Sequence, residues 1–147
     1  MDQNMDKLKK ATKDNTPLLY FNGLITYAKA VEIHTGDSFD IIILYSNVVY
    51  RFKAKMFGYD CIEVDPSHLS LKNGKEIEKK IIDSKNRLIE LIGDKEYFKI
   101  HCHEIDKYGR LLISVMVNND SNKCDFKNTV NNIMIQEGHG SPYWWWI

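Results

Sequence analysis

Apolar residues alternate with polar ones along residues 25–34 and 48–57, and residues 37–45 between them hold the apolar run Ile41 to Leu44, which predicts a buried strand. A period of two places successive side chains on opposite faces of a β-strand. Short turns separate the segments. The second turn, Ser46-Asn47, ends in an asparagine, which tolerates the positive φ of a tight hairpin. The pattern therefore predicts a three-stranded meander.

The period changes in the second half of the chain. Between residues 75 and 92 apolar residues recur at helical spacing, after a loop that ends at Asn73-Gly74 and before a stop signal at Gly93. Residues 97–103 and 111–117 read as two more strands, and residues 128–136 as a short helix. The predicted fold class is α+β. It is a five-stranded OB-type Greek-key barrel with a long helix between strands 3 and 4 and a shorter C-terminal helix.

Composition divides the chain into three parts. Residues 1–17 form a polar N-terminal extension, residues 18–143 hold the predicted barrel domain, and residues 144–147 are an aromatic tail of three tryptophans and an isoleucine. We expect the tail to pack on the domain or to form an oligomer contact, because large exposed apolar patches are uncommon. The oligomeric state itself is left open.

Charge and cysteine usage narrow the classes of function. The 147 residues include 20 basic and 20 acidic side chains, so any contact with nucleic acid must come from a local patch and not from a global positive field. The three cysteines are an odd number without framework spacing, which argues against a disulfide scaffold. No signal peptide or membrane span is visible, so we expect an intracellular, cytoplasmic protein without a membrane partner.

Charged residues gather where the predicted strands end. Asp37 lies at the turn between strands 1 and 2, Lys55 ends strand 3, and Asp60 and Glu63 follow it. Strand ends that open into loops are places where a rigid scaffold holds reactive groups. Each of these residues also has a purely structural interpretation: Asp37 as a turn former, Lys55 as a solvated edge residue, and the two acids as parts of a solvated turn. Arg110, just before the last predicted strand, could likewise be a surface cation.

His101-Cys102-His103 is a second candidate for metal binding. On a strand the two histidines share one face while Cys102 points to the other. No further group of ligands accompanies them in the sequence, which favours a structural role.

Three separated pieces together resemble the staphylococcal nuclease-like (thermonuclease) family. They are the turn Gly36-Asp37-Ser38, the acids that follow Lys55, and an intact D-K-Y-G-R at residues 106–110. The closing residues 137–143 resemble the ending of viral and cellular members of the family. The resemblance covers about residues 25–143, and its pieces occur in the family's order on matching elements.

The resemblance implies a metal-dependent site. Asp37 and Asp60 would bind one calcium ion, or another divalent metal, together with the backbone carbonyl of Cys61, because such cations prefer hard oxygen ligands. Glu63 would orient or deprotonate the attacking water. The reaction of the family is hydrolysis of phosphodiester bonds in DNA and RNA, which leaves 3′-phosphate ends.

The resemblance also implies how substrate would be held. Lys55 and Arg110 would bind the phosphate and stabilise the charge that develops on it. Tyr108 and Tyr143 lie where the aromatic groups of the family meet the nucleotide, with Lys107 beside them. The implied partner is therefore DNA, RNA or both.

Four departures from the family pattern change the expectation. Lys55 stands in place of an arginine that forks two hydrogen bonds to phosphate, and Thr35 in place of a metal-binding acid. Ile62 replaces a proline before Glu63, and Cys61 replaces a threonine. We expect a weaker nuclease or one with altered metal preference. The alternative is a non-catalytic nucleic-acid or protein-binding module on the same barrel.

Overall fold

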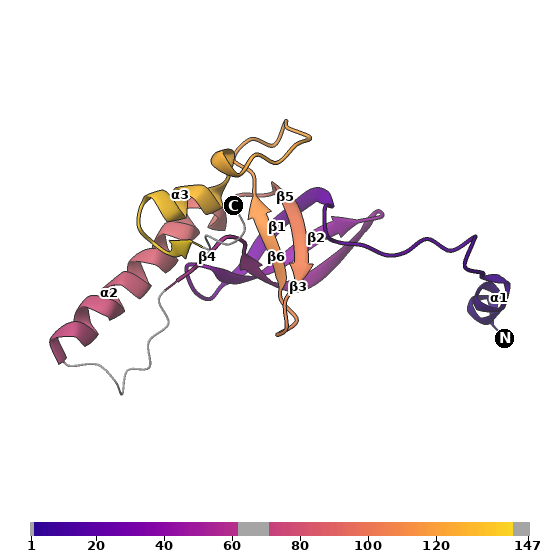
Figure 1. The fold of residues 1–147 in the computed structure, drawn as a ribbon, viewed down its shortest axis with the longest axis horizontal. Helices are drawn as coiled ribbons and strands as arrows, with labels where there is room; N and C mark the ends of the chain where they lie inside the picture. The colour runs from indigo at the N-terminus through magenta and orange to yellow at the C-terminus, as the bar shows by residue number, and fades with distance from the viewer. Residues whose placement is uncertain (1, 62–70, 143–147) are drawn as a thin grey trace.

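The computed structural model of the chain describes residues 2–61 and 71–142, and five of its strands close into a barrel in the order β1-β2-β3-β6-β5 (Figure 1). These strands are β1 (Ile25–Ile33), β2 (Ser38–Tyr45), β3 (Val48–Met56), β5 (Phe98–Ile105) and β6 (Leu111–Val115). Neighbouring strands run antiparallel except β3 and β6, which run parallel. The predicted α+β fold with a closed five-stranded barrel is confirmed, and it is compatible with an OB-like fold.

The predicted hairpin between β2 and β3 is confirmed. Ser46 and Asn47 have φ angles of 51° and 64°, the left-handed region that two-residue hairpin turns require at both positions. The ladder then continues without interruption from Tyr45 opposite Val48 to Ser38 opposite Lys55. This register brings the start of β2 next to the end of β3.

Side chains at alternate positions fill the barrel. Phe39, Ile41 and Ile43 of β2 and Ala54 and Met56 of β3 are at most 1% exposed. Burying a large apolar side chain of this kind contributes about 1.5–3 kcal/mol. The inward face of the meander is therefore the core, and the polar side chains between these positions point to the other face.

The long helix α2 (Leu71–Leu88) follows the third barrel strand and continues as a π-helical turn, Ile89–Gly93. Leu88 and Ile92 of this segment are fully buried against the barrel. The helix begins four residues before the predicted start, so the prediction that Asn73-Gly74 ends the loop was wrong. A glycine inside a helix costs only about 1 kcal/mol relative to alanine, and the packing of the helix outweighs that cost.

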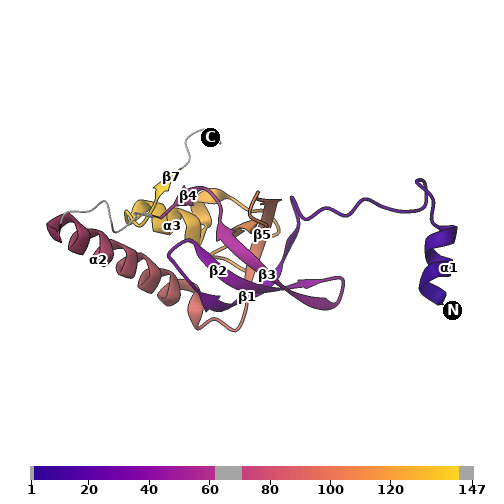
Figure 2. The ribbon, with the colours of Figure 1, turned by 90° about the horizontal axis from the view of Figure 1, so that it is seen from below.

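Two short strands were not predicted. β4 (Tyr59–Asp60) pairs antiparallel with β7 (Ser141–Pro142), and this pair joins the end of the third barrel strand to the C-terminal part of the chain (Figure 2). Gly140 permits the pairing, because a Cβ at that position would lie 2.3 Å from Cδ2 of Tyr59. Asp60 therefore lies on a paired strand and not in an open loop.

Three short helices complete the fold. α3 (Val130–Gln136) begins at Thr129, whose side chain accepts a hydrogen bond from the backbone of Asn132, and follows the 3-10 helix η3 (Phe126–Asn128). α1 (Gln3–Lys10) buries none of its residues, and an extended segment joins it to the barrel (Figures 1 and 2). Within the described residues, every helix is too short or too polar to span a lipid bilayer.

Candidate functional site

One cleft of about 720 Å³ collects most of the residues that the sequence suggested for a site. Its lining residues come from the start of β2, the end of β3, β4 and the β5–β6 turn: Asp37, Lys53, Lys55, Asp60, Cys61, Tyr108 and Arg110. The segments are far apart in the chain, and the barrel register brings them together because β3 lies between β2 and β6.

Asp37 is 3% exposed and both of its carboxylate oxygens are engaged. The hydroxyl of Thr35 donates to Oδ1 over 2.8 Å, and the backbone N–H of Cys61 donates to Oδ2 over 2.9 Å. Thr35 replaces an acid of the family pattern, and in this chain its hydroxyl orients the acid that remains. A buried carboxylate requires such donors, since an unpaired one would be very costly.

Lys55 lies between the two candidate metal-binding acids. Its Nζ is 3.1 Å from Oδ2 of Asp37 and 2.7 Å from Oδ1 of Asp60, and it donates to the backbone carbonyl of Tyr59 over 3.0 Å. Lys55 is only 6% exposed. The interpretation of this lysine as a solvated edge residue was therefore wrong, because its ammonium lies against Asp37 and against Tyr59 and Asp60 of β4.

Close packing fixes the turn before Asp37 against α2 and β4. The hydroxyl of the fully buried Tyr59 donates to the backbone carbonyl of Gly36 over 2.8 Å. A Cβ on Gly36 would lie 2.6 Å from Cβ of Ser84 and 2.8 Å from Sγ of Cys61. A glycine is needed here because two other segments approach the backbone, so the position of Asp37 depends on the whole fold.

Arg110 reaches the cleft from a turn that Asp106 organises. Oδ1 of Asp106 accepts hydrogen bonds from the backbone N–H groups of Tyr108 and Arg110, and Oδ2 accepts one from Nε of Arg110, each over 2.9 Å. Desolvation opposes ionisation of Asp106, but the hydrogen bonds from Arg110 and Tyr108 outweigh it and lower its pKa. The D-K-Y-G-R motif is thus a turn that holds its arginine in one direction.

Tyr108 and Lys107 differ in their relation to the cleft. Tyr108 lines it and is 69% exposed, with the guanidinium carbon of Arg110 5.3 Å from its ring centroid. Nζ of Lys107 lies 5.2 Å from the same ring, but Lys107 does not belong to the lining. The structure therefore brings Tyr108 into the candidate site and leaves Lys107 at its margin.

Glu63, the predicted base, and Tyr143, a predicted substrate contact, lie outside the described residues, as do residues 144–147. Lys53 lines the cleft although it was not predicted as a site residue. It stands two residues before Lys55 on the same strand face, and this spacing could have identified it. The contact of Lys55 with the carbonyl of Tyr59 could not be predicted, because every residue has a backbone carbonyl whatever its side chain.

The thiol of Cys61 has no acid–base role at neutral pH. Burial, followed by the nearby carboxylate of Asp37, raises its pKa to about 12. The thiol donates to the backbone carbonyl of His139 over 3.3 Å. Cys61 therefore contributes packing and a backbone N–H to the site, and the thiol stays protonated.

The oxygens at the cleft suit a hard divalent cation. Asp37 and Asp60 each direct one carboxylate oxygen at the same point, which Nζ of Lys55 occupies, and the exposed Asp60 opens this point to the cleft. Calcium prefers six to eight oxygen ligands, some of them water. The donor set fits a cation with a partly hydrated shell, provided that Lys55 moves.

A second group of potential ligands lies on the outer face of β1 and β2. One ligand atom each from Glu32, His34 and Asp40 lies within 4.8 Å of the others. Arg51 engages the same acids, with Nε 3.1 Å from Asp40 and Nη2 3.8 Å from Glu32. The guanidinium already offsets part of the negative charge of these acids.

His101 and His103 share a face, as predicted, with ring centroids 4.6 Å apart. Cys102 points into the core and is fully buried. One ring nitrogen of His103 lies 2.8 Å from the hydroxyl of Ser114. This segment thus supports the barrel, consistent with the structural role that the sequence favoured.

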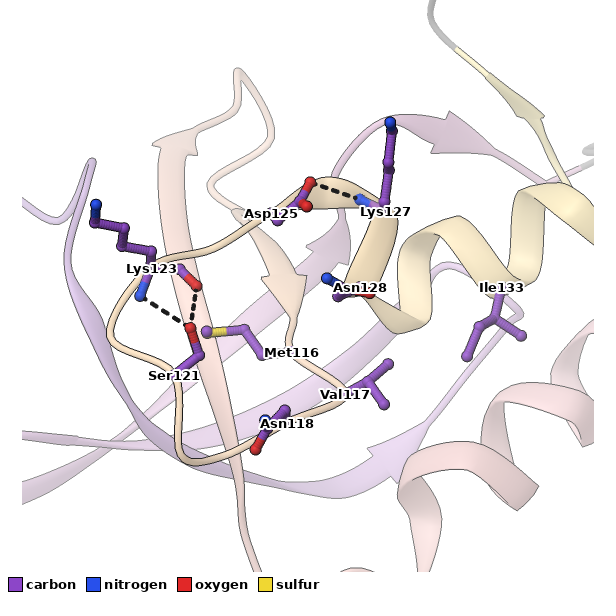
Figure 3. A pocket seen from close by; sticks show the side chains of 9 residues that line it. All are labelled: Met116, Val117, Asn118, Ser121, Lys123, Asp125, Lys127, Asn128 and Ile133. Atoms are coloured by element: carbon purple, nitrogen blue, oxygen red, sulfur yellow. Dashed lines mark hydrogen bonds between the residues drawn. The ribbon is translucent and has the colours of Figure 1, made fainter.

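A second cavity of about 420 Å³ opens in the segment between β6 and α3 (Figure 3). It is lined by Met116, Val117, Asn118, Ser121, Lys123, Asp125, Lys127, Asn128 and Ile133. Figure 3 shows the side chains of Lys123 and Lys127 extending in different directions, so their ammonium groups do not converge on one ligand. Among the predicted site residues that the structure describes, none lines this cavity.

Comparison with models of known protein families and with curated proteins found no match to this chain. The resemblance to the thermonuclease family therefore rests on the motifs and on where the barrel places them.

Proposed function

We propose that the cleft hydrolyses phosphodiester bonds of DNA, RNA or both with the help of a divalent cation, calcium in the first place. The observation that supports this proposal is the convergence of Asp37, Lys55, Asp60 and Arg110, from segments up to 73 positions apart in the sequence, on one cleft. Two acids beside two cations provide ligands for a metal ion and for a phosphate at the same place.

In this proposal four residues of the cleft have separate roles in binding the metal and the substrate. Asp37 and Asp60 hold the cation, which when bound would polarise a phosphate oxygen as a Lewis acid. Arg110, aligned by Asp106, binds the phosphate and stabilises the charge that develops on it. Tyr108 offers an exposed ring on which a base can stack without sequence preference.

The water that attacks phosphorus needs a base, and that role is assigned to Glu63 by the resemblance alone. Attack forms a new P–O bond and breaks the bond between phosphorus and the 5′ oxygen, which leaves with a proton. The products are a 3′-phosphate and a 5′-hydroxyl end.

One observation favours the alternative, a binding module without turnover. The ammonium of Lys55 engages both acids, and a cleft that kept this arrangement would bind phosphate through Arg110 and Lys53 without a metal. The two functions differ in their dependence on calcium, which makes them separable by experiment.

A cleavage assay with single- and double-stranded DNA and RNA tests the proposal in calcium, magnesium, manganese and chelator. We expect calcium-dependent products with 3′-phosphate ends. Arg110→Ala should lower kcat by about 10²–10³-fold, as removal of one stabilising donor typically does. Arg51→Ala, an arginine outside the cleft lining, is the matched control and should retain near wild-type activity.

Two outcomes contradict the proposal. Product formation that is equal in wild type and in Arg110→Ala would show that the cleft does not perform the reaction. Metal-independent binding without any product in the four conditions would favour the binding module.

A further inference from the structure

We propose that Lys55 is a built-in competitor of the divalent metal: its ammonium and the metal use the same carboxylate oxygens, and metal binding releases Lys55 into the cleft, where it can reach the phosphate. This inference rests on the proposed function for the identity of the ligand. It adds that the two cations exclude one another and that the lysine changes its partner during the cycle.

The hydrogen bonds of Asp37 indicate that Lys55 occupies a carboxylate oxygen that a metal ion would need. Its Oδ2 accepts from the backbone N–H of Cys61 and from Nζ of Lys55, which occupies the two in-plane lone pairs of that oxygen. Its Oδ1 accepts from the hydroxyl of Thr35. The N–H of Cys61 is part of the backbone, so Lys55 is the donor that can leave Oδ2 without a rearrangement of the chain.

Repulsion between a bound metal ion and the ammonium of Lys55 would favour release of the lysine. A cation bound to Asp37 and Asp60 would lie close to an ammonium that is 3.1 Å and 2.7 Å from the same two carboxylates. Like charges at such a separation repel strongly, and more so where water is largely excluded. Lys55 and Asp37 are both buried, so solvent screens little of this repulsion.

The surroundings show where the released side chain would go. Asp60, the acid on the open side of Lys55, is exposed, and the cleft of about 720 Å³ begins there with Arg110 and Tyr108 among its lining residues. The four-carbon stem of lysine is flexible and ends in a compact charge. Lys55 can therefore turn from Asp37 toward a phosphate held by Arg110, whereas the planar fork of an arginine would have to reorient as a whole.

Calorimetric titration of the full chain with calcium alone, without nucleic acid, tests the competition. Lys55→Met should bind calcium at least about tenfold more tightly than wild type, because the variant removes a buried like charge. Lys53→Met removes a cation from the same cleft and strand face and is the matched control. It should change the affinity by less than about threefold, because Lys53 is exposed and its charge is screened.

A second variant guards against a folding failure of Lys55→Met, since removal of the ammonium leaves a buried acid. Lys55→Gln retains a donor for the carbonyl of Tyr59 and removes the charge, and it should show the same gain in affinity. Circular dichroism spectra verify that each titrated variant is folded. Calcium affinity in the folded Lys55 variants that is equal to or weaker than that of wild type, including no detectable binding in all of them, overturns the proposal.

The wild-type chain provides an independent readout. Amine-reactive labelling followed by mass spectrometry should show a several-fold rise in the modification of Lys55 when calcium is added, while modification of Lys53 stays constant. Unchanged protection of Lys55 at a calcium concentration that saturates the calorimetric signal would also overturn the proposal. Both readouts are independent of cleavage, so a chain that shows the competition but forms no product would contradict the proposed function alone.

Discussion

Two ion pairs join β3 to β2 or to the residue just before it, and only one of the two pairs belongs to the candidate site. In the cleft, Asp37 pairs with Lys55, and on the outer face Asp40 pairs with Arg51. The two acids are similarly buried, 3% and 8% exposed. The cations differ: the side chain of Lys55 is 8% exposed and that of Arg51 is 61% exposed.

This difference decides what each pair can do. Arg51 keeps most of its hydration, so its attraction to Asp40 replaces contacts with water and contributes little. Lys55 has exchanged water for Asp37, Asp60 and the carbonyl of Tyr59, so it depends on these partners. A buried cation with two acids can respond to a ligand, whereas a solvated pair mainly stabilises the surface of the strands.

The largest expected effect comes from removing the acid of each pair. Asp37→Asn should lower the free energy of unfolding by about 3 kcal/mol, because it removes a buried carboxylate that faces the buried ammonium of Lys55. Asp40→Asn, the matched variant, should cost about 1 kcal/mol or less, because Arg51 stays in water. Chemical denaturation of both variants measures the difference, and equal losses would mean that burial of the cation does not distinguish the pairs.

His103 tests the effect of burial on an ionisable side chain: it is partly buried on β5 beside Ser114 and Phe57. Desolvation, followed by repulsion from His101, lowers its pKa to about 4. As the pH falls below about 6.5, His103 binds a proton in the unfolded chain, whereas in the folded chain it binds that proton only near pH 4. The fold should therefore lose up to about 3 kcal/mol across this range, at about 1.4 kcal/mol per unit of pKa.

The measurement combines NMR titration of the imidazole protons with unfolding at several pH values. His103→Gln keeps a partner for Ser114 and removes the titration, so its stability should fall less steeply between about pH 6.5 and pH 4. A titration midpoint of His103 near its ordinary value, or parallel stability curves for wild type and variant, would contradict the effect assigned to burial.

The smallest effect is expected at the outer pair. The side-chain hydrogen bond from Arg51, followed by that from His34, lowers the pKa of Asp40. The contribution of Arg51 to stability should thus be present above the ordinary pKa of an aspartate and disappear as the pH falls through the lowered pKa. Arg51→Gln should cost at most about 1 kcal/mol near pH 7, and less at high salt, which screens exposed charges.

Unfolding curves of wild type and Arg51→Gln at neutral and acid pH, each at low and high salt, measure this contribution. The gap between the two proteins should close on acidification. A gap that persists at acid pH would show that the contribution of Arg51 does not depend on the charge of Asp40. A gap that salt does not reduce would show that the outer pair is shielded from solvent.

The parts of the fold that could be predicted depend on local patterns. Alternation at Phe52, Ala54 and Met56 marks a strand because the period of the backbone decides which side chains can be buried together. The start of α2 was missed because Asn73-Gly74 is a local loop signal, whereas the packing of a helix of 18 residues acts over its whole length. β4 and β7 are two residues each, too short for any period to appear.

The candidate site was predictable only as a set of residue types. Asp37, Lys55, Asp60 and Arg110 could be named from their order along the chain, and the structure places them around one cleft. Lys53 was not predicted because it lies outside the three motif pieces, although it shares a strand face with Lys55. The partners of Lys55 could not be predicted, since one of them is a backbone carbonyl.

The sequence by itself determined the barrel strands, the Ser46-Asn47 turn and the turn that Asp106 organises, because each follows from a period or from side-chain contacts within a few residues. Only the tertiary structure decided that Lys55 is buried between two acids. That burial requires Tyr59 and Asp60 of β4 to lie beside the ammonium of Lys55, and β4 pairs with β7, where Gly140 closely approaches Tyr59. Contacts between segments some 80 positions apart arise when the chain packs, and no local pattern encodes them.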